Sequence, residues 1–139
     1  MQETIGFIGC GNIAMAMMGG MLRSGRFQPE QIIASNRSEK ALVRARELYG
    51  IRTSSDNKQV AREADFLFLT IPSGAYPSVI AEIDGFTKPE AIIILIAVGE
   101  TIEKNEKRFG RPQKLIKAMP NTPSLVGEGV TGMAMNGLV

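Results

Sequence analysis

The sequence predicts an α/β fold, a doubly wound and mostly parallel sheet with helices on both faces. Short apolar runs alternate with longer amphipathic segments, which is the pattern of buried strands joined by crossover helices. Most of the apolar runs lack polar residues at alternate positions, as expected of strands covered on both faces. A glycine-rich turn directly follows the first run. In sheets built with right-handed crossovers, such a turn lies at the carboxyl ends of the strands, where ligands bind.

Six short segments are predicted to form strands. Most are rich in Ile, Leu and Phe and are bounded by residues that favour turns. The predicted strands are residues 4–8, 32–35, 66–71, 92–96, 115–119 and 130–135.

Cap residues mark two of the helices between these strands. Ser38 is a favoured N-cap, and Gly50 stands where the chain leaves the same helix. Thr101 is the N-cap predicted for a later helix. The helix after Ser38 has an apolar face that is predicted to be buried, namely Ala41, Leu42, Ala45, Leu48 and Tyr49. The helix after the glycine-rich turn carries methionines that are predicted to pack in the core, namely Met15, Met17, Met18 and Met21.

Length and charge limit the function classes. The 139 residues suit one domain with a sizeable core. The 16 basic and 14 acidic residues leave a net charge of +2, which argues against a nucleic-acid partner. There is no histidine, so His-dependent triads and His-containing zinc sites are excluded, and no metal site is predicted.

Cysteine use and hydropathy point to a compartment. Cys10 is the single cysteine, which fits a reducing environment. The longest apolar run, residues 91–98, is far shorter than the about 20 residues of a membrane span. No signal peptide is recognised at the start of the chain. A soluble, cytoplasmic protein without a membrane partner is therefore expected.

The glycine-rich turn has the pattern G-x-G-x-x-A. Gly9 allows a tight turn, Gly11 lets the backbone approach a pyrophosphate, and the small Ala14 lets the following helix pack closely on the strand. The amino end of that helix favours an anion. Cys10 is predicted to fill space, because no base is visible to activate its thiol. The pattern predicts a dinucleotide site of the Rossmann type formed by Gly9, Cys10, Gly11, Asn12, Ile13 and Ala14.

The end of the second predicted strand distinguishes NAD from NADP. NAD sites usually carry an acidic residue there, which binds the ribose hydroxyls. This chain has Ser35, Asn36 and Arg37 instead. A guanidinium forms charge-assisted hydrogen bonds with a 2′-phosphate, which a carboxylate would repel. NADP(H) is therefore the predicted cofactor, and the alternative interpretation is a solvated arginine at the entry of a helix.

A later segment carries a resemblance to a known family. Residues 118–129 read AMPNTPSLVGEG, which closely matches the M-P-N-T-P-A-L-V-G-x-G signature of pyrroline-5-carboxylate reductases. Further matches are residues 35–37, the turn at 55–57 and residues 97–101. The resemblance to the amino-terminal NADP-binding domain of that family covers nearly the whole of this chain. It covers about half of a typical family member.

The resemblance implies an activity and a domain organisation. The activity is NADPH-dependent reduction of 1-pyrroline-5-carboxylate, a small cyclic imine carboxylate, to L-proline in proline biosynthesis. Residues 1–139 would be the NADP-binding Rossmann domain, with the family's carboxy-terminal dimerisation and substrate domain absent from this chain. A homo-oligomer is expected for the full-length family member, and the isolated chain is expected to turn over poorly.

The resemblance also implies contacts to the cofactor. The turn at 9–14 would bind the pyrophosphate, residues 35–37 the 2′-phosphate end and Asn57 the adenosine ribose. The nicotinamide ribose and ring would lie between Thr70, Ile71 and Pro72 on one side and Ala97, Val98 and Gly99 on the other. Asn121 and Thr122 would face the substrate. No residue is assigned as a catalytic acid or base.

Two departures from the family pattern leave alternatives open. The family usually reads V-K-P where residues 70–72 read T-I-P, and S-I-A-A-G plus an apolar residue where residues 95–100 read L-I-A-V-G-E. Both departures fall at the expected nicotinamide end, so they concern the substrate more than the cofactor. The alternatives are another imine, hydroxyacid or deazaflavin-linked NADP-dependent oxidoreductase, and a non-catalytic NADP-sensing module.

Overall fold

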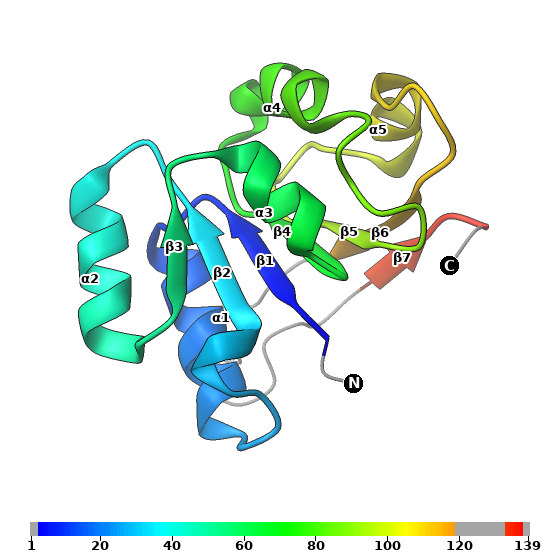
Figure 1. Ribbon diagram of the computed structural model, residues 1–139. Coiled ribbons are helices and arrows are strands. Elements are labelled where there is room, and N and C mark those ends of the chain that lie inside the picture. Colours follow the sequence, from blue (N-terminus) through cyan, green and yellow to red (C-terminus); the bar gives the residue numbers. More distant parts are fainter. Residues whose placement is uncertain (1–2, 119–132, 138–139) are drawn as a thin grey trace.

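The structure, a computed structural model, describes residues 3–118 and 133–137 (Figure 1). Its centre is a seven-stranded sheet in the order β3-β2-β1-β4-β5-β6-β7. β1 to β6 run parallel, and β7 pairs antiparallel with β6 at one edge. The strands are β1 Ile5–Ile8, β2 Ile32–Ser35, β3 Arg52–Ser54, β4 Phe66–Leu69, β5 Ile92–Leu95, β6 Lys114–Ala118 and β7 Met133–Met135.

Helices cover both faces of the sheet, so the predicted doubly wound fold of the Rossmann type is confirmed. α1 and α2 pack on one face, and α3, α4 and α5 lie on the other. The helices are α1 Asn12–Arg23, α2 Glu39–Tyr49, α3 Asn57–Glu63, α4 Tyr76–Ile83 and α5 Ile102–Arg108, with short 3₁₀ turns η1 at Pro29–Gln31 and η2 at Ser73–Ala75. In the described part of the chain, no helix is long and apolar enough to cross a membrane.

Each face of the sheet has its own apolar core. On the α1 and α2 face, the rings of Phe7 and Phe68 stack with centroids 4.9 Å apart, because β1 and β4 pair these two residues directly. Met15, Met17 and Met18 are buried in the same layer, as predicted, and Met21 is partly buried. On the other face, Tyr76 and Ile80 are fully buried against β4 and β5.

The predicted caps are formed. The Ser38 side chain accepts from the Ala41 amide, and Gly50 ends α2 in the left-handed region with φ 71°. The Thr101 hydroxyl accepts from the Lys104 amide at the start of α5. The predicted apolar face of α2 is too wide by one residue, because Leu48 points away from the core and is 60% exposed.

Two differences concern strands. β3 was not among the predicted strands: its side chains are polar and at least partly exposed, so it lacks the apolar run that marks the others. β4 ends at Leu69, two residues earlier than predicted, because the Thr70 side chain and amide turn back to the carbonyl of Ile8. Residues 130–132 of the last predicted strand lie outside the described residues.

Candidate functional site

The candidate site lies at the carboxyl ends of the parallel strands, where the strand order reverses. From β1 the chain proceeds outward to β2 and β3 and then returns to β4 on the other side of β1. The loops after β1 and β4 diverge at such a switch point and leave room for a ligand. The cavity found there has a volume of about 930 Å³. Its lining comes from the segments after β1, β4 and β5 and from β6, namely Gly11, Asn12, Ile13, Thr70, Ile71, Pro72, Ser73, Ile96, Ala97, Val98, Gly99 and Lys117.

Gly9 makes the turn that opens the site. Its φ of +102° lies in the region that favours glycine, and a Cβ at this position would collide with the Thr70 carbonyl. The Gly9 amide donates to the Ser35 carbonyl at 2.9 Å, and the Thr70 hydroxyl lies 2.7 Å from the Gly9 carbonyl oxygen. The turn is therefore fixed from β2 on one side and from β4 on the other.

The amino end of α1 is open. Gly11 is its N-cap, no side chain caps the helix, and the first turn holds no acidic residue. A Cβ on Gly11 would meet no atom of residues 3–118 and 133–137 within 4 Å, whereas Ala14 is fully buried against the sheet. In the described residues, then, the first backbone N–H groups of α1 face space that an anion can enter. The residues present fit a pyrophosphate.

Cys10 lies beneath this turn. Its side chain is 3% exposed and touches the Ala41 carbonyl and the Met15 sulfur. Burial raises the pKa of the Cys10 thiol, and the nearby Arg44 guanidinium lowers it by less. A buried, protonated thiol fills space, as the sequence predicts. Arg44 is a second cation near the turn, and sequence reasoning missed it because its position depends on how α2 packs.

The end of β2 carries the residues predicted for the adenosine side. Arg37 is exposed, and within residues 3–118 and 133–137 its side chain forms no hydrogen bond or ion pair. The Asn36 side chain accepts from the Cys10 amide at 3.0 Å and so supports the glycine turn. Of the three predicted residues, only Arg37 presents a free polar side chain to solvent.

Ser35 is placed differently from the prediction. Its side chain is fully buried, and its hydroxyl donates to Asn57 Oδ1 at 2.6 Å. The Asn57 amide in turn donates to Glu82 at 2.9 Å. Ser35 therefore orients Asn57 at the start of α3, and its hydroxyl points toward α3 and not to the surface.

The opposite wall of the cavity joins the segments after β4 and β5. Ile71 and Pro72 line the cavity together with Ala97 and Val98, so the structure brings the two segments predicted for the nicotinamide side to one cavity. Lys117 also lines the cavity and donates from Nζ to the Ala97 carbonyl, which ties β6 to this wall. Burial lowers the pKa of Lys117, and the Glu100 carboxylate opposes that shift. Lys117 was missed in the sequence, although it is the single lysine of the predicted strand 115–119 and therefore a visible signal.

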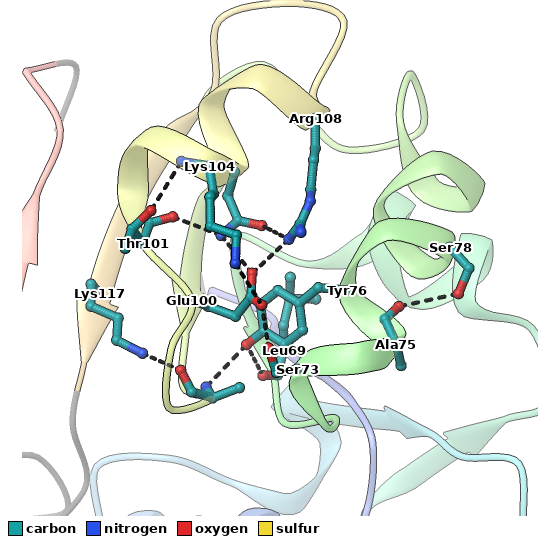
Figure 2. Close-up of polar contacts among 12 residues, drawn as sticks. Leu69, Ser73, Ala75, Tyr76, Ser78, Glu100, Thr101, Lys104, Arg108 and Lys117 are labelled. Carbon is teal, nitrogen blue, oxygen red and sulfur yellow. Dashed lines mark hydrogen bonds and ion pairs between the residues drawn. The ribbon is translucent and has the colours of Figure 1, made fainter.

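Tyr76 joins the segments after β4 and β5 that form this wall (Figure 2). Its hydroxyl donates to the Leu69 carbonyl at 2.8 Å and accepts from the amides of Ile96 and Ala97 at 3.1 and 3.2 Å. The side chain is fully buried, and burial raises the pKa of its phenol. One hydroxyl thus holds the carboxyl ends of β4 and β5 together.

Replacing Tyr76 with phenylalanine is expected to lower the free energy of unfolding by about 2 to 4 kcal/mol, because two backbone N–H groups lose their acceptor in a buried position. Urea denaturation measures the loss. Tyr49→Phe is the matched control, since it removes a single hydrogen bond to the Met15 carbonyl and is expected to cost about 1 kcal/mol. Equal losses in the two variants would contradict the bracing role.

Glu100 forms a buried charged cluster next to this wall (Figure 2). Its side chain is 1% exposed and accepts from Arg108 at 2.5 Å, from Asn105 at 3.1 Å and from the Ser73 hydroxyl. Burial opposes the charged form, but these hydrogen bonds outweigh it and hold the pKa of Glu100 below its usual value. Sequence reasoning noted Glu100 only as a departure, because its partners come from two separate elements, the η2 turn after β4 and helix α5.

The lowered pKa of Glu100 predicts a pH dependence of stability. A carboxyl whose pKa is lower in the folded state stabilises the fold above its unfolded pKa of about 4.3, and this contribution is lost as the pH falls through the folded value. The difference in unfolding free energy between the wild type and Glu100→Gln is therefore expected to be largest near neutral pH and to shrink below about pH 4. Urea denaturation at several pH values tests this, and a constant difference would contradict it.

The described residues offer no obvious catalytic acid or base. Among the described residues that line the cavity, Lys117 is the one that is ionisable. No group of three potential metal-ligating side chains occurs in residues 3–118 and 133–137. The predicted substrate-side residues Asn121 and Thr122 lie outside the described residues.

Comparisons with known proteins find reductases that are similar to this chain. The chain is 35% identical over 139 residues to a pyrroline-5-carboxylate reductase of Escherichia coli K12, covering 100% of the chain and 52% of that protein. A pyrroline-5-carboxylate reductase structure from Coxiella burnetii matches with a TM-score of 0.91 and 33% identity, covering 100% of this chain and 52% of that one. A Plasmodium falciparum pyrroline carboxylate reductase structure with NADP bound matches with a TM-score of 0.85 and 27% identity, covering 99% and 50%.

The chain therefore spans about half the length of the pyrroline-5-carboxylate reductases that it matches. Residues 4–99 match the model of a family described as NADP oxidoreductase, coenzyme F420-dependent. This match includes the glycine turn and the end of β2. It also includes the segments after β4 and β5, which line the cavity. Since the match extends over more than half of the chain, the protein belongs to this NADP oxidoreductase family.

Proposed function

We propose that this chain is the NADP(H)-binding domain of a pyrroline-5-carboxylate reductase. The observation that carries the proposal is the open turn at Gly11, which faces a cavity of about 930 Å³ at the switch point of the sheet. The identity of 35% to the Escherichia coli reductase supports the substrate class, a small cyclic imine carboxylate. The Plasmodium falciparum relative, whose structure holds NADP, supports the cofactor.

The proposed cofactor runs across the switch point. The N–H groups at the start of α1 bind the pyrophosphate, because they are uncapped and the helix dipole favours an anion there. Asn57 is oriented by Ser35 to meet the adenosine ribose. Arg37 extends from the end of β2 toward the 2′-phosphate, and Arg44 adds positive charge near the turn.

The nicotinamide half lies in the cavity between Ile71 and Pro72 on one side and Ala97, Val98 and Gly99 on the other. When bound, NADPH supplies the hydride for imine reduction. The chain's own residues bind and orient the cofactor, and the mostly apolar wall around Ile71 excludes water from one side of it. No residue of this chain is proposed as an acid or base.

The proposal assigns residues 1–139 to the cofactor domain. The residues that order the substrate and form a homo-oligomer then belong to the half of the reductases that this chain does not match. A cytoplasmic location and a small-molecule substrate, without a nucleic-acid partner, complete the proposed function.

Proline formation tests the activity. The complete gene product is expected to convert 1-pyrroline-5-carboxylate to proline with NADPH, while the 139-residue chain binds NADPH and turns over poorly. Binding of NADPH by both proteins without proline formation by the complete product would contradict the proposed substrate.

A second candidate is another imine, hydroxyacid or deazaflavin-linked oxidoreductase. Ile71, where the reductases usually have lysine, and the F420-dependent description of the matching family favour it. Reduction of coenzyme F420 or of a different imine, with no turnover of pyrroline-5-carboxylate, would support this candidate. A complete product that binds NADP(H) and reduces none of these substrates would instead support a non-catalytic NADP-sensing module.

A further inference from the structure

Val98 and Gly99 form a projecting tip at the edge of the cavity. Val98 is 93% exposed, and Gly99 has a φ of +86°, with no atom of the described residues within 4 Å of an added Cβ. The tip therefore gains little from packing of its own. Its position depends on the residues that anchor it at either end, namely Ala97 before it and Glu100 after it.

The anchor at Ala97 is a pair of hydrogen bonds to the backbone. The Ala97 amide donates to the Tyr76 hydroxyl at 3.2 Å, and the Ala97 carbonyl accepts from Lys117 (Figure 2). Both partners belong to regular elements, α4 and β6. The first end of the tip is thus fixed to the sheet and to the helix that covers it.

The anchor at Glu100 joins the tip to the opposite rim. Figure 2 shows the Glu100 carboxylate between Ser73, which follows Ile71 and Pro72 after β4, and Arg108 of α5. Asn105 donates to the same carboxylate, and Lys104 lies 3.9 Å from it. Since Ser73 also lines the cavity, this carboxylate links the two segments between which the nicotinamide half is proposed to lie.

Burying the Glu100 carboxylate at this position is energetically unfavourable unless other groups compensate it. A carboxylate with 1% exposure is stable only when its partners compensate the lost hydration, and here three donors and a nearby ammonium do so. Removing the carboxylate would leave Arg108 and the fully buried Asn105 without this acceptor. The cluster would then have to rearrange, and the Ser73 link to the tip would be lost.

We propose that Glu100 is a positioning residue that holds the Val98–Gly99 tip against the Pro72–Ser73 segment and thereby sets the affinity for the nicotinamide half of NADP(H). The inference rests on the proposed function, because it takes the cavity as the nicotinamide site. It concerns one half of the cofactor only, since the adenosine ribose and the 2′-phosphate are assigned to Asn57 and Arg37, on the β2 and β3 side of β1.

Two ligands separate the halves of the cofactor. NADPH contains both halves, whereas adenosine 2′,5′-bisphosphate has the adenosine, the 2′-phosphate and one further phosphate but no nicotinamide. Calorimetry measures the affinity of the 139-residue chain for each ligand. The variants are Glu100→Val, which removes the carboxylate, and Glu100→Gln, which keeps one oxygen acceptor. Glu103→Gln is the matched control, because Glu103 is exposed on α5, close to Glu100 in the sequence, and its substitution removes the same charge.

The expected result is selective. Glu100→Val lowers the affinity for NADPH by about tenfold or more, because a mobile rim must be ordered on binding, while the affinity for the bisphosphate changes by less than about twofold. The NADPH affinity of Glu100→Gln is expected to lie between that of Glu100→Val and that of the wild type. Glu103→Gln is expected to bind both ligands with the wild-type affinity. Circular dichroism checks that each variant is folded.

Several outcomes would overturn the inference. Unchanged NADPH affinity in Glu100→Val would show that the tip is positioned without the carboxylate. Equal losses for both ligands would indicate a general structural role. If Glu100→Val does not fold, Arg108→Met decides in its place, since Arg108 touches Glu100 and does not line the cavity. A wild-type chain that binds neither ligand would instead overturn the proposed function, and this inference with it.

Discussion

Replacing Gly9 with alanine is expected to destabilise the protein by about 3 kcal/mol or more. A Cβ at this position would collide with the Thr70 carbonyl and lie 2.9 Å from Ile71 Cγ2, and the φ of +102° is strained for any residue with a side chain. Neither neighbour can move freely, because Thr70 is hydrogen-bonded to β1 through its amide and hydroxyl. Urea denaturation of the wild type and the variant measures the loss.

Gly11→Ala is the matched control from the same turn. Gly11 has an ordinary extended φ of −85°, and an added Cβ would meet no atom of the described residues within 4 Å. The free energy of unfolding is therefore expected to change by less than about 1 kcal/mol. The added methyl group would, however, occupy the space through which a pyrophosphate approaches the α1 backbone. Gly11→Ala is therefore expected to weaken NADPH binding while the fold is kept. The account of the turn would be wrong if Gly9→Ala were as stable as Gly11→Ala.

Replacing Arg37 with methionine is expected to lower the affinity for NADPH by about 10- to 100-fold, the loss expected for a hydrogen bond to a charged phosphate. The affinity for NADH should change by less than about twofold, because NADH lacks the 2′-phosphate. Arg37 forms no hydrogen bond or ion pair within the described ranges, so the fold should be unaffected. Calorimetry with both cofactors measures the difference.

Lys107→Met is the control for the charge change, since Lys107 is exposed at the end of α5 and lines no part of the cavity. It should leave both affinities unchanged. If Arg37→Met weakened NADPH and NADH equally, or weakened neither, the guanidinium would not be the group that recognises the 2′-phosphate.

Much of the fold could be predicted from the sequence, because the buried strands are continuous apolar runs. The runs around Phe7, Leu67 and Ile93 are buried on both faces of the sheet, so each leaves a signal in the sequence. β3 leaves none, because Arg52, Thr53 and Ser54 form an edge strand with exposed or half-exposed side chains. Its pairing with β2 depends on where α2 and α3, the helices before and after it, place this segment.

The candidate site divides in the same way. The glycine turn could be predicted because its backbone geometry demands particular residues at Gly9 and Ala14. The contacts of Tyr76, Glu100 and Lys117 could not, because each depends on partners that only the folded chain brings together. Ser35 was recognised in the sequence as part of a binding motif, but the structure shows that its hydroxyl orients Asn57.

The central claim is that the backbone at the start of α1 and the guanidinium of Arg37 together bind NADP(H). Titrating the wild-type chain with NADPH and with NADH in a calorimeter tests it most directly. The account predicts binding of both, with NADPH tighter by about tenfold or more. Equal or tighter binding of NADH would contradict it.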